Sequence, residues 1–207
     1  GRLSLGVNET IVHTWLPVLV ERIAREYPGL DLDIDVDVSH NLRDRVTSQD
    51  IDLALMLGPI ASPVLQSCSL CRFPLAFVAS NVIAFDGEKP DLAAVTRYPI
   101  LTFARNTAPY LAIRGIFANP ALPKSRIQAS TSLATIVRMA LDGIGVAVMT
   151  PAIVSQELHD GRLRRLDVAV DLPDLLCEAA WRRGPNTLMV QAAAELAAHV
   201  AAEWTSR

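Results

Sequence analysis

The sequence of 207 residues has few cysteines, few aromatic residues and no excess of positive charge. Its three cysteines do not suit the disulfide framework of a small secreted protein, so an intracellular, cytoplasmic protein is expected. Aromatic residues make up 5% of the chain and hydrophobic residues 51%, which indicates a globular protein with an aliphatic core. The net charge of −3 is unlike that of a stand-alone nucleic-acid-binding protein, which usually carries a basic surplus.

Membrane and export signals are also lacking. No apolar run reaches the length that spans a membrane. The first residues, Gly1-Arg2-Leu3-Ser4-Leu5, lack the charged and apolar regions of a secretory signal. Neither membrane association nor export is therefore expected.

The cysteine and histidine patterns predict no metal site, cofactor site or active site. Cys68 and Cys71 form a Cys-x-x-Cys motif, but they lie in a segment, 64–73, that reads as a strand. Residues three apart on a strand face opposite sides, so buried thiols are a better interpretation than a redox or zinc site. The histidines are scattered singly along the chain, at His13, His40, His159 and His199. Because neither a Gly-x-Ser-x-Gly elbow nor a His-x-x-x-His pair occurs, no enzymatic activity is expected.

The clearest local pattern lies between residues 130 and 151. Apolar residues recur with the spacing of a helix that buries one face, at Leu133, Ile136, Val137, Ala140 and Leu141. Gly143 follows, where a helix can end in a left-handed conformation, and 144–149 reads as a buried parallel strand. A hydroxyl of the triplet 130–132, such as that of Thr131, caps this helix, and the positive end of the helix dipole would also favour a small anion there.

The N-terminal part of the chain predicts a parallel sheet. Segments 2–7, 31–38 and 51–57 read as strands, separated by a helix and then a shorter helix. The first helix begins near Thr10 and contains Trp15, Leu19 and Ile23, and the second is capped by Ser39 or Asn41. In such sheets, ligands bind at the carboxyl ends of the strands, where Asn8, Thr10 and Gly58 lie.

The segment 31–38 alternates aspartate with aliphatic residues. Four carboxylates on one face of a strand suggest either a metal site or a half-exposed edge strand. The edge strand is the better interpretation, because an acidic face discourages edge-to-edge pairing and carboxylate ligands usually converge from loops.

A second series of strands and helices follows, so the predicted architecture is α/β with two Rossmann-like lobes. Lobe I comprises 1–74 and 181–207, lobe II comprises 75–180, and two crossover strands join them. Polar side chains follow the strands of both lobes, which is the layout of a ligand cleft between hinged lobes.

Five short motifs resemble the effector-binding domain of LysR-type transcriptional regulators. They are Arg2-Leu3-Ser4-Leu5-Gly6; Leu16-Pro17 with Tyr27-Pro28; Asp52-Leu53-Ala54-Leu55 with Gly58-Pro59; Gly143-Ile144-Gly145-Val146-Ala147 with Pro151; and Glu157-Leu158 with Gly161-Arg162-Leu163. Their order and spacing cover the whole chain. The resemblance implies a periplasmic-binding-protein-like fold of type II, with a small-molecule effector in the cleft between the lobes.

The resemblance also implies a set of effector-binding residues. They are Asn8, Glu9, Thr10, Gly58, Thr102, Arg105, Thr107 and Thr131. Arg105 is a strong cation at this rim, which favours an organic or inorganic anion as the effector, although a solvated loop arginine is the alternative. Glu9 departs from the hydroxyl or amide residues usual in the family and either counters Arg105 or disfavours strongly anionic effectors.

Partners follow from the same resemblance. Members of the family carry an N-terminal winged helix-turn-helix that is absent from this chain, so DNA contact is expected only through such a domain. Sensor domains of the family pair side by side, and a homodimer is expected here, with a tetramer for the full-length protein. A solute-binding protein of a transport system shares the fold and is the alternative function.

Overall fold

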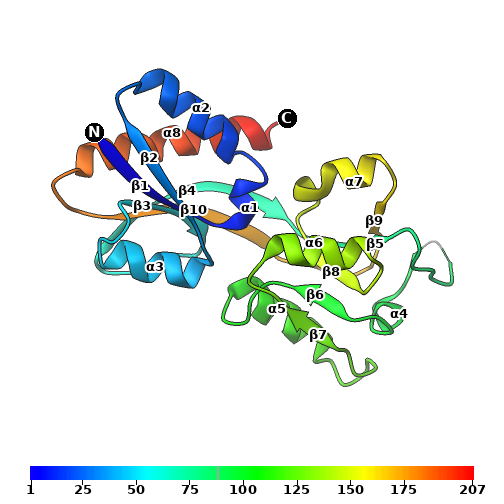
Figure 1. Cartoon of the computed structure of the whole chain (residues 1–207). Coiled ribbons are helices and arrows are strands. Elements are labelled where there is room, and N and C mark those ends of the chain that lie inside the picture. Colours follow the sequence, from blue (N-terminus) through cyan, green and yellow to red (C-terminus); the bar gives the residue numbers. More distant parts are fainter. Residues whose placement is uncertain (88) are drawn as a thin grey trace. The chain divides into compact units, whose positions relative to one another are not determined.

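The computed structural model describes residues 1–87 and 89–207, which form two compact units (Figure 1). Unit 1 comprises Gly1–Phe73 and Leu176–Arg207, and unit 2 comprises Pro74–Leu175. The chain therefore passes between the units twice. Each unit contains a mixed sheet of five strands with helices packed on it, which is an α/β fold.

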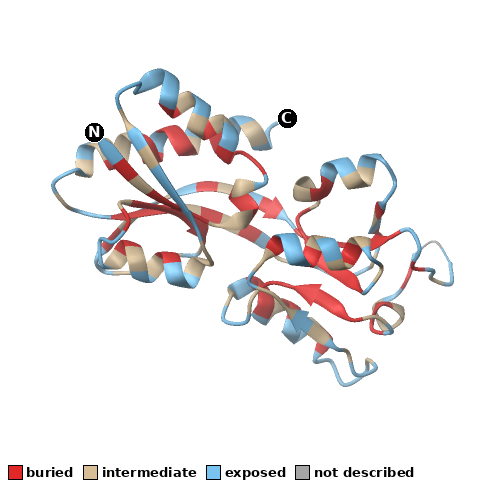
Figure 2. Ribbon diagram, in the orientation of Figure 1, coloured by how far each residue is buried: buried red, intermediate tan, exposed pale blue. Residues whose placement is uncertain are grey.

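Unit 1 is built on a sheet with the strand order β2-β1-β3-β10-β4. The strands are β1 (Arg2–Val7), β2 (Asp31–Val36), β3 (Leu53–Leu57), β4 (Leu65–Pro74) and β10 (Asp174–Arg182). β1 runs parallel to β2 and β3, as the sequence predicted, whereas β10 runs antiparallel to β3. The helices are α1 (Glu9–Val12), α2 (Leu16–Glu26), α3 (Ser39–Thr47) and α8 (Thr187–Thr205). Buried residues follow β1 and β3 (Figure 2).

The predicted first helix is two helices, and the first of them begins at Glu9, one residue before the predicted start. α1 begins after Asn8, whose side-chain oxygen accepts a hydrogen bond from the Thr10 N–H at 3.1 Å, so Asn8 and not Thr10 is the N-cap. α2 begins after the buried Trp15, with Pro17 in its first turn. A proline in the interior of one continuous helix would remove a backbone hydrogen bond and clash with the preceding turn, so the helix restarts at this point.

β2 is an edge strand, which confirms the interpretation of its alternating aspartates. Its residues are mostly exposed, and two of its carboxylates form ion pairs, Asp33 with Arg2 and Asp35 with Arg45. The described residues contain no group of three or more His, Cys, Asp or Glu side chains that could hold a metal ion.

Unit 2 is built on a sheet with the strand order β7-β6-β8-β5-β9. The strands are β5 (Ala76–Ser80), β6 (Ile100–Thr102), β7 (Ile127–Ala129), β8 (Val146–Met149) and β9 (Leu163–Leu166). The helices are α4 (Leu92–Val95), α5 (Ala108–Phe117), α6 (Leu133–Leu141), the 3-10 helix η1 (Pro151–Val154) and α7 (Ser155–His159). β6 is parallel to β7 and β8, and β5 is antiparallel to β8 and β9.

The predicted helix and strand after residue 130 are confirmed as α6 and β8. α6 buries Leu133, Ile136 and Ala140 against side chains of the sheet, and Gly143 has the left-handed φ of 70° that was expected. The cap, however, is Ser132, whose hydroxyl accepts a hydrogen bond from the Thr135 N–H at 3.2 Å. The prediction that Thr131 caps this helix is therefore wrong.

Two further elements of unit 2 differ from the expectation. β9 was not predicted, because its four residues, Leu-Arg-Arg-Leu, carry two charges and show no alternation. The sequence also predicts a helix that begins at Thr150-Pro151 and continues through Ile153, Val154 and Leu158. In the structure this segment starts as the 3-10 helix η1 and continues as α7. Within the described ranges, no helix combines the length and the apolar character needed to cross a membrane.

Candidate functional site

The predicted site residues of unit 1 lie at the carboxyl ends of β1 and β3. These strands are parallel neighbours, so the loops that follow them meet at one edge of the sheet. The Asn8 N–H donates to the Leu55 carbonyl oxygen at 2.8 Å, which fixes the start of α1 against β3. The structure thus brings the segment 8–10 and the end of β3 together.

Ser39 is at the centre of this edge and was not predicted as a site residue. Its hydroxyl accepts a hydrogen bond from the Asn8 side-chain nitrogen at 3.1 Å and another from the Leu57 N–H at 3.0 Å. The sequence suggested Ser39 or Asn41 as a helix cap, but Val38 occupies the N-cap position of α3. Ser39 instead connects three segments that are distant in the sequence.

Gly58 has a structural role that is evident from its surroundings. Its N–H donates to the Leu176 carbonyl oxygen at 2.8 Å, and a Cβ at this position would collide with the carboxylate of Glu178. That carboxylate accepts a hydrogen bond from the Ile60 N–H at 2.7 Å. Glycine therefore gives Glu178 the space to hold the turn after β3.

Glu9 and Thr10 differ in exposure. The Glu9 carboxylate lies 3.4 Å from the His13 ring nitrogen, one helical turn away, in a partly exposed pair. Thr10 is 2% exposed, and its carbonyl oxygen accepts the Thr14 hydroxyl at 2.9 Å.

In unit 2, Thr102 is a fully buried polar residue at the carboxyl end of β6. It has 0% exposure, and its hydroxyl has no hydrogen-bond partner among the residues that the structure describes. Its backbone carbonyl accepts the Ser130 N–H at 3.1 Å, so it lies beside the loop after β7. A buried hydroxyl without a partner costs about 1–3 kcal/mol, which a ligand that bonds to it would recover.

The loop from Ser130 to Ser132 is held mostly by its own hydroxyl groups. The Ser130 hydroxyl accepts the Ser132 N–H at 3.0 Å and donates to the Ser132 carbonyl oxygen at 3.2 Å. Thr131, between them, is exposed, and no hydrogen bond of its side chain occurs within 1–87 and 89–207. The loop therefore presents the Thr131 hydroxyl to solvent at the positive end of α6.

Arg105 and Thr107 follow β6 and are positioned by α5. The exposed Arg105 guanidinium donates to the Tyr110 hydroxyl at 3.1 Å and lies 5.7 Å from the centre of the Tyr110 ring. No carboxylate pairs with Arg105 in the described part of the chain. The Thr107 hydroxyl accepts the Tyr110 N–H and donates to the Ala104 carbonyl oxygen, so it serves as the cap of α5.

The three cysteines are free thiols, and the Cys-x-x-Cys motif is not a pair. Hydrogen bonding between Cys71 and Cys177, from neighbouring strands of unit 1, lowers the pKa of Cys71 and raises that of Cys177 well above its ordinary value. Burial raises the pKa of Cys68. Cys71 thus interacts with Cys177 rather than with Cys68.

Comparison with known proteins identifies relatives among bacterial regulators. The family described as "LysR substrate binding domain" matches residues 1–202. The regulator BbuR of Bordetella bronchiseptica is 26% identical over 84% of this chain, and IlvR of Caulobacter vibrioides is 28% identical over 88%. Both are HTH-type transcriptional regulators, and the chain spans 53% and 62% of their lengths.

Solved structures show the same fold. The regulatory domain of CcmR from Synechocystis PCC6803, in complex with 2-PG, matches with a TM-score of 0.81 and 20% identity, covering 97% of each chain. The reduced form of the OxyR regulatory domain from Pseudomonas aeruginosa matches with a TM-score of 0.75 and 20% identity, covering 96% of this chain and 98% of that one.

Proposed function

Because the chain belongs to the LysR substrate-binding domain family, the effector-binding domain of LysR-type transcriptional regulators, we propose that it senses a small anionic metabolite. Domains of this family regulate transcription and are not enzymes, which agrees with the expectation from the sequence. The relatives named above are transcriptional regulators, not transport proteins, so a regulatory role is favoured over the alternative of solute transport.

The observation that carries the proposal is the buried Thr102 hydroxyl, which has no hydrogen-bond partner among the described residues. It lies at the carboxyl end of β6, beside the loop that leads into α6. A ligand oxygen at this edge would satisfy the hydroxyl and would lie near the positive end of the α6 dipole. Arg105, on the loop that follows β6, has no carboxylate partner among the described residues, and its charge also favours an anion over a neutral compound.

The remaining predicted contacts are part of the proposal. In unit 2 they include the exposed Thr131 hydroxyl, while Thr107 acts mainly by positioning α5. In unit 1 they are Asn8, which is held in place by Ser39, Thr10, whose N–H donates to the Asn8 side chain, Glu9 and Gly58. The CcmR domain binds 2-PG, and by analogy we propose a small organic acid as the effector class.

The proposal for the whole protein is transcriptional control. We propose that the domain acts together with a helix-turn-helix domain like those of its relatives, and that effector binding changes how that domain meets DNA. We also propose a homodimer, because the edge strand β2 exposes apolar side chains, with Ile34 39% and Val36 53% exposed. Sedimentation of the chain as a monomer at high concentration would contradict the dimer.

The test is thermal unfolding in the presence of a panel of anions: sulfate, phosphate, and aliphatic and aromatic carboxylates. An anion present at 100 times its dissociation constant should raise the free energy of unfolding by about 2.7 kcal/mol. With the best anion, Thr102→Val and Thr131→Val should each lower the affinity by about 1–3 kcal/mol, which is roughly five- to 150-fold.

Two results would contradict the proposal. If no anion in the panel stabilises the domain, the anion class is wrong. If an anion stabilises the Thr102→Val variant as much as the unaltered domain, the site is not at the end of β6. Lys124→Gln, which removes a positive charge from a turn of unit 2, is the control for a general charge effect.

A further inference from the structure

The thiols of Cys71 and Cys177 lie on the two strands by which the chain passes between the units. β4 leads from unit 1 into unit 2, and β10 leads back. The two strands are neighbours in the sheet of unit 1, so they run in opposite directions. Cys71 is three residues before the end of β4 at Pro74, and Cys177 is three residues after the start of β10 at Asp174.

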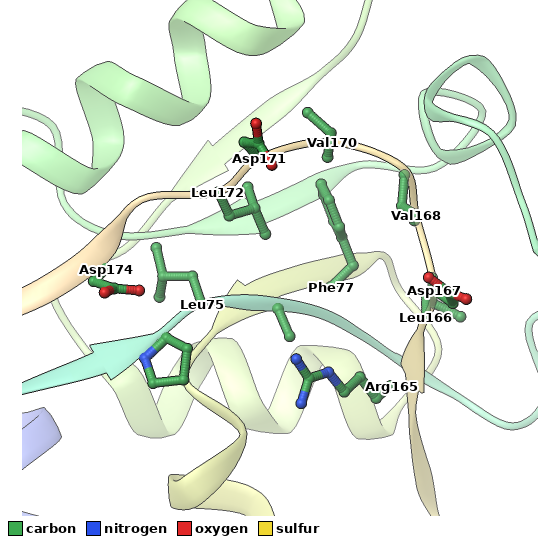
Figure 3. Close-up of a pocket in the computed structure, with 12 residues that line it drawn as sticks. Leu75, Phe77, Arg165, Leu166, Asp167, Val168, Val170, Asp171, Leu172 and Asp174 are labelled. Atoms are coloured by element: carbon green, nitrogen blue, oxygen red, sulfur yellow. The ribbon is translucent and has the colours of Figure 1, made fainter.

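The ends of these two strands at unit 2 lie close together. Leu75, which directly follows β4, lines one pocket of unit 2 together with Leu172 and Asp174, as Figure 3 shows. In an antiparallel pair, residues equally far from two adjoining ends lie opposite each other, with about 4.5–5.5 Å between their Cβ atoms. Cys71 and Cys177 therefore occupy opposite positions, which agrees with the hydrogen bonding between their thiols.

The two thiols differ in access and in acidity. Cys71 is partly exposed, whereas Cys177 is 0% exposed. Hydrogen bonding from Cys177 lowers the pKa of Cys71 although burial acts in the opposite direction, and burial raises the pKa of Cys68. Because the thiolate is the reactive form of cysteine, Cys71 is the thiol that an oxidant attacks first, and Cys177 is a second thiol in reach of it.

The indole of Trp15 provides a second observation at the same sulfur. Trp15 is 0% exposed, and its N–H has no partner of hydrogen-bonding geometry within 1–87 and 89–207. The pKa of Cys71 is nevertheless lowered by this indole, after the larger contribution of Cys177, so the indole lies beside the Cys71 sulfur. An oxygen atom added to that sulfur would give the buried N–H an acceptor.

We propose that hydroperoxides oxidise Cys71, which then forms a reversible disulfide with Cys177. With hydrogen peroxide, the Cys71 sulfur takes one OH group, the O–O bond breaks, and the other oxygen leaves as water with the Cys71 proton. The Cys177 sulfur then attacks the sulfenic acid of Cys71. The S–S bond forms, the S–O bond breaks, and a second water leaves with the Cys177 proton. In total, two thiols lose two electrons and one peroxide becomes two waters.

The disulfide would join the two segments through which the chain enters and leaves unit 2. The Cβ atoms of a disulfide are about 3.8 Å apart, so the strands must approach each other slightly, and a strained bond of this kind is readily reduced. Formation and reduction of the bond would change the spacing of the two segments. This input is separate from the anion site at the ends of β6 and β7, and it does not depend on that proposal.

The experiment exposes the folded 207-residue chain to one equivalent of hydrogen peroxide and maps its peptides by mass spectrometry without reduction. A disulfide between Cys71 and Cys177, with the loss of two hydrogen atoms, is the expected product, and dithiothreitol should reverse it. Cys71 should be oxidised at least about fivefold faster than Cys68, which lies on the same strand and is also partly exposed.

Two variants separate the steps. In Cys177→Ala, Cys71 should stop at the sulfenic acid, which dimedone labels. In Cys68→Ser, the matched control on the same strand, the disulfide should form as in the unaltered chain.

Four outcomes would overturn the proposal. Peroxide leaves Cys71 and Cys177 unlinked in the folded chain. Cys68 is linked to Cys177 in place of Cys71. The disulfide joins two copies of the chain, seen on a non-reducing gel. The disulfide forms only after the chain is unfolded in urea, which would mean that the two thiols do not meet in the folded protein.

Discussion

The two units place polar groups at the same kind of position, the carboxyl ends of parallel strands, but they treat them differently. In unit 1, Asn8 and Ser39 hydrogen-bond to each other, and Ser39 also accepts the Leu57 N–H. In unit 2, the Thr102 hydroxyl is buried with no partner among the described residues, and the Thr131 side chain points to solvent. One edge is satisfied by its own residues, whereas the other keeps unused hydrogen-bonding capacity.

This difference suggests different roles for the two edges: the polar groups of unit 1 hold their own loops in position, and those of unit 2 are available to bind a ligand. A satisfied network stabilises the loops that form it, so its loss is felt in the folded state. A buried hydroxyl without a partner destabilises the fold and becomes favourable only when a ligand supplies the partner, which is a common trade between stability and function. Substitutions at the unit 1 edge should therefore affect stability most, and substitutions at the unit 2 edge should affect binding most.

The largest stability effect is expected from Gly58→Ala in unit 1. The new Cβ would collide with the Glu178 carboxylate and displace it from the Ile60 N–H. We expect a loss of about 3 kcal/mol in the free energy of unfolding, measured by urea denaturation.

Two comparisons identify the cause of that loss. In a Glu178→Ala background, Gly58→Ala should cost much less, because the colliding carboxylate is gone. Gly115→Ala, in α5 of unit 2, has open space around the new Cβ and should stabilise the domain by about 0.5–1 kcal/mol. An undiminished cost in the Glu178→Ala background would show that the collision is not the reason for glycine at position 58.

A smaller loss is expected from Ser39→Ala. The change leaves the Asn8 side-chain nitrogen and the Leu57 N–H without their shared acceptor. Urea denaturation should show a loss of about 2 kcal/mol. Ser67→Ala, on the exposed side of β4, should change stability by less than about 0.5 kcal/mol. If Ser39→Ala cost no more than Ser67→Ala, the hydrogen bonds of Ser39 would not stabilise unit 1, and the contrast with the edge of unit 2 would be lost.

Local patterns were enough to predict much of the fold. The apolar spacing of α6, the left-handed Gly143 and the parallel order of β1, β2 and β3 all follow from residues close together in the sequence. β9 escaped prediction because its strand conformation comes from pairing with β5, which lies more than 80 residues earlier, and not from its own alternation.

The candidate site was less predictable for the same reason. Polar residue types at the strand ends indicated Asn8 and Thr102 as site residues. The hydrogen bonds around them, however, join segments that are far apart in the sequence, and these could not be predicted from local patterns. Ser39 looked like a cap from its neighbours, although its partners are Asn8, 31 residues away, and Leu57, 18 residues away. Likewise, Ser130, Thr131 and Ser132 all carry a hydroxyl that could cap α6. Only the conformation of the loop decides that the Ser132 hydroxyl, and not that of Thr131, accepts the Thr135 N–H.

A smaller stability effect than those of Gly58→Ala and Ser39→Ala, and of opposite sign, is expected from Thr102→Val. Valine has nearly the shape of threonine and no hydroxyl, so the substitution removes a buried group without a partner and breaks no hydrogen bond of the described residues. Without effector, the free energy of unfolding should stay the same or rise by up to about 1 kcal/mol in urea denaturation. Thr102→Ser, which keeps the hydroxyl but loses a buried methyl group, should instead destabilise the domain by about 1 kcal/mol. A clear loss of stability in Thr102→Val would mean that the hydroxyl already has a partner in the unliganded domain, and the contrast between the two units would then disappear.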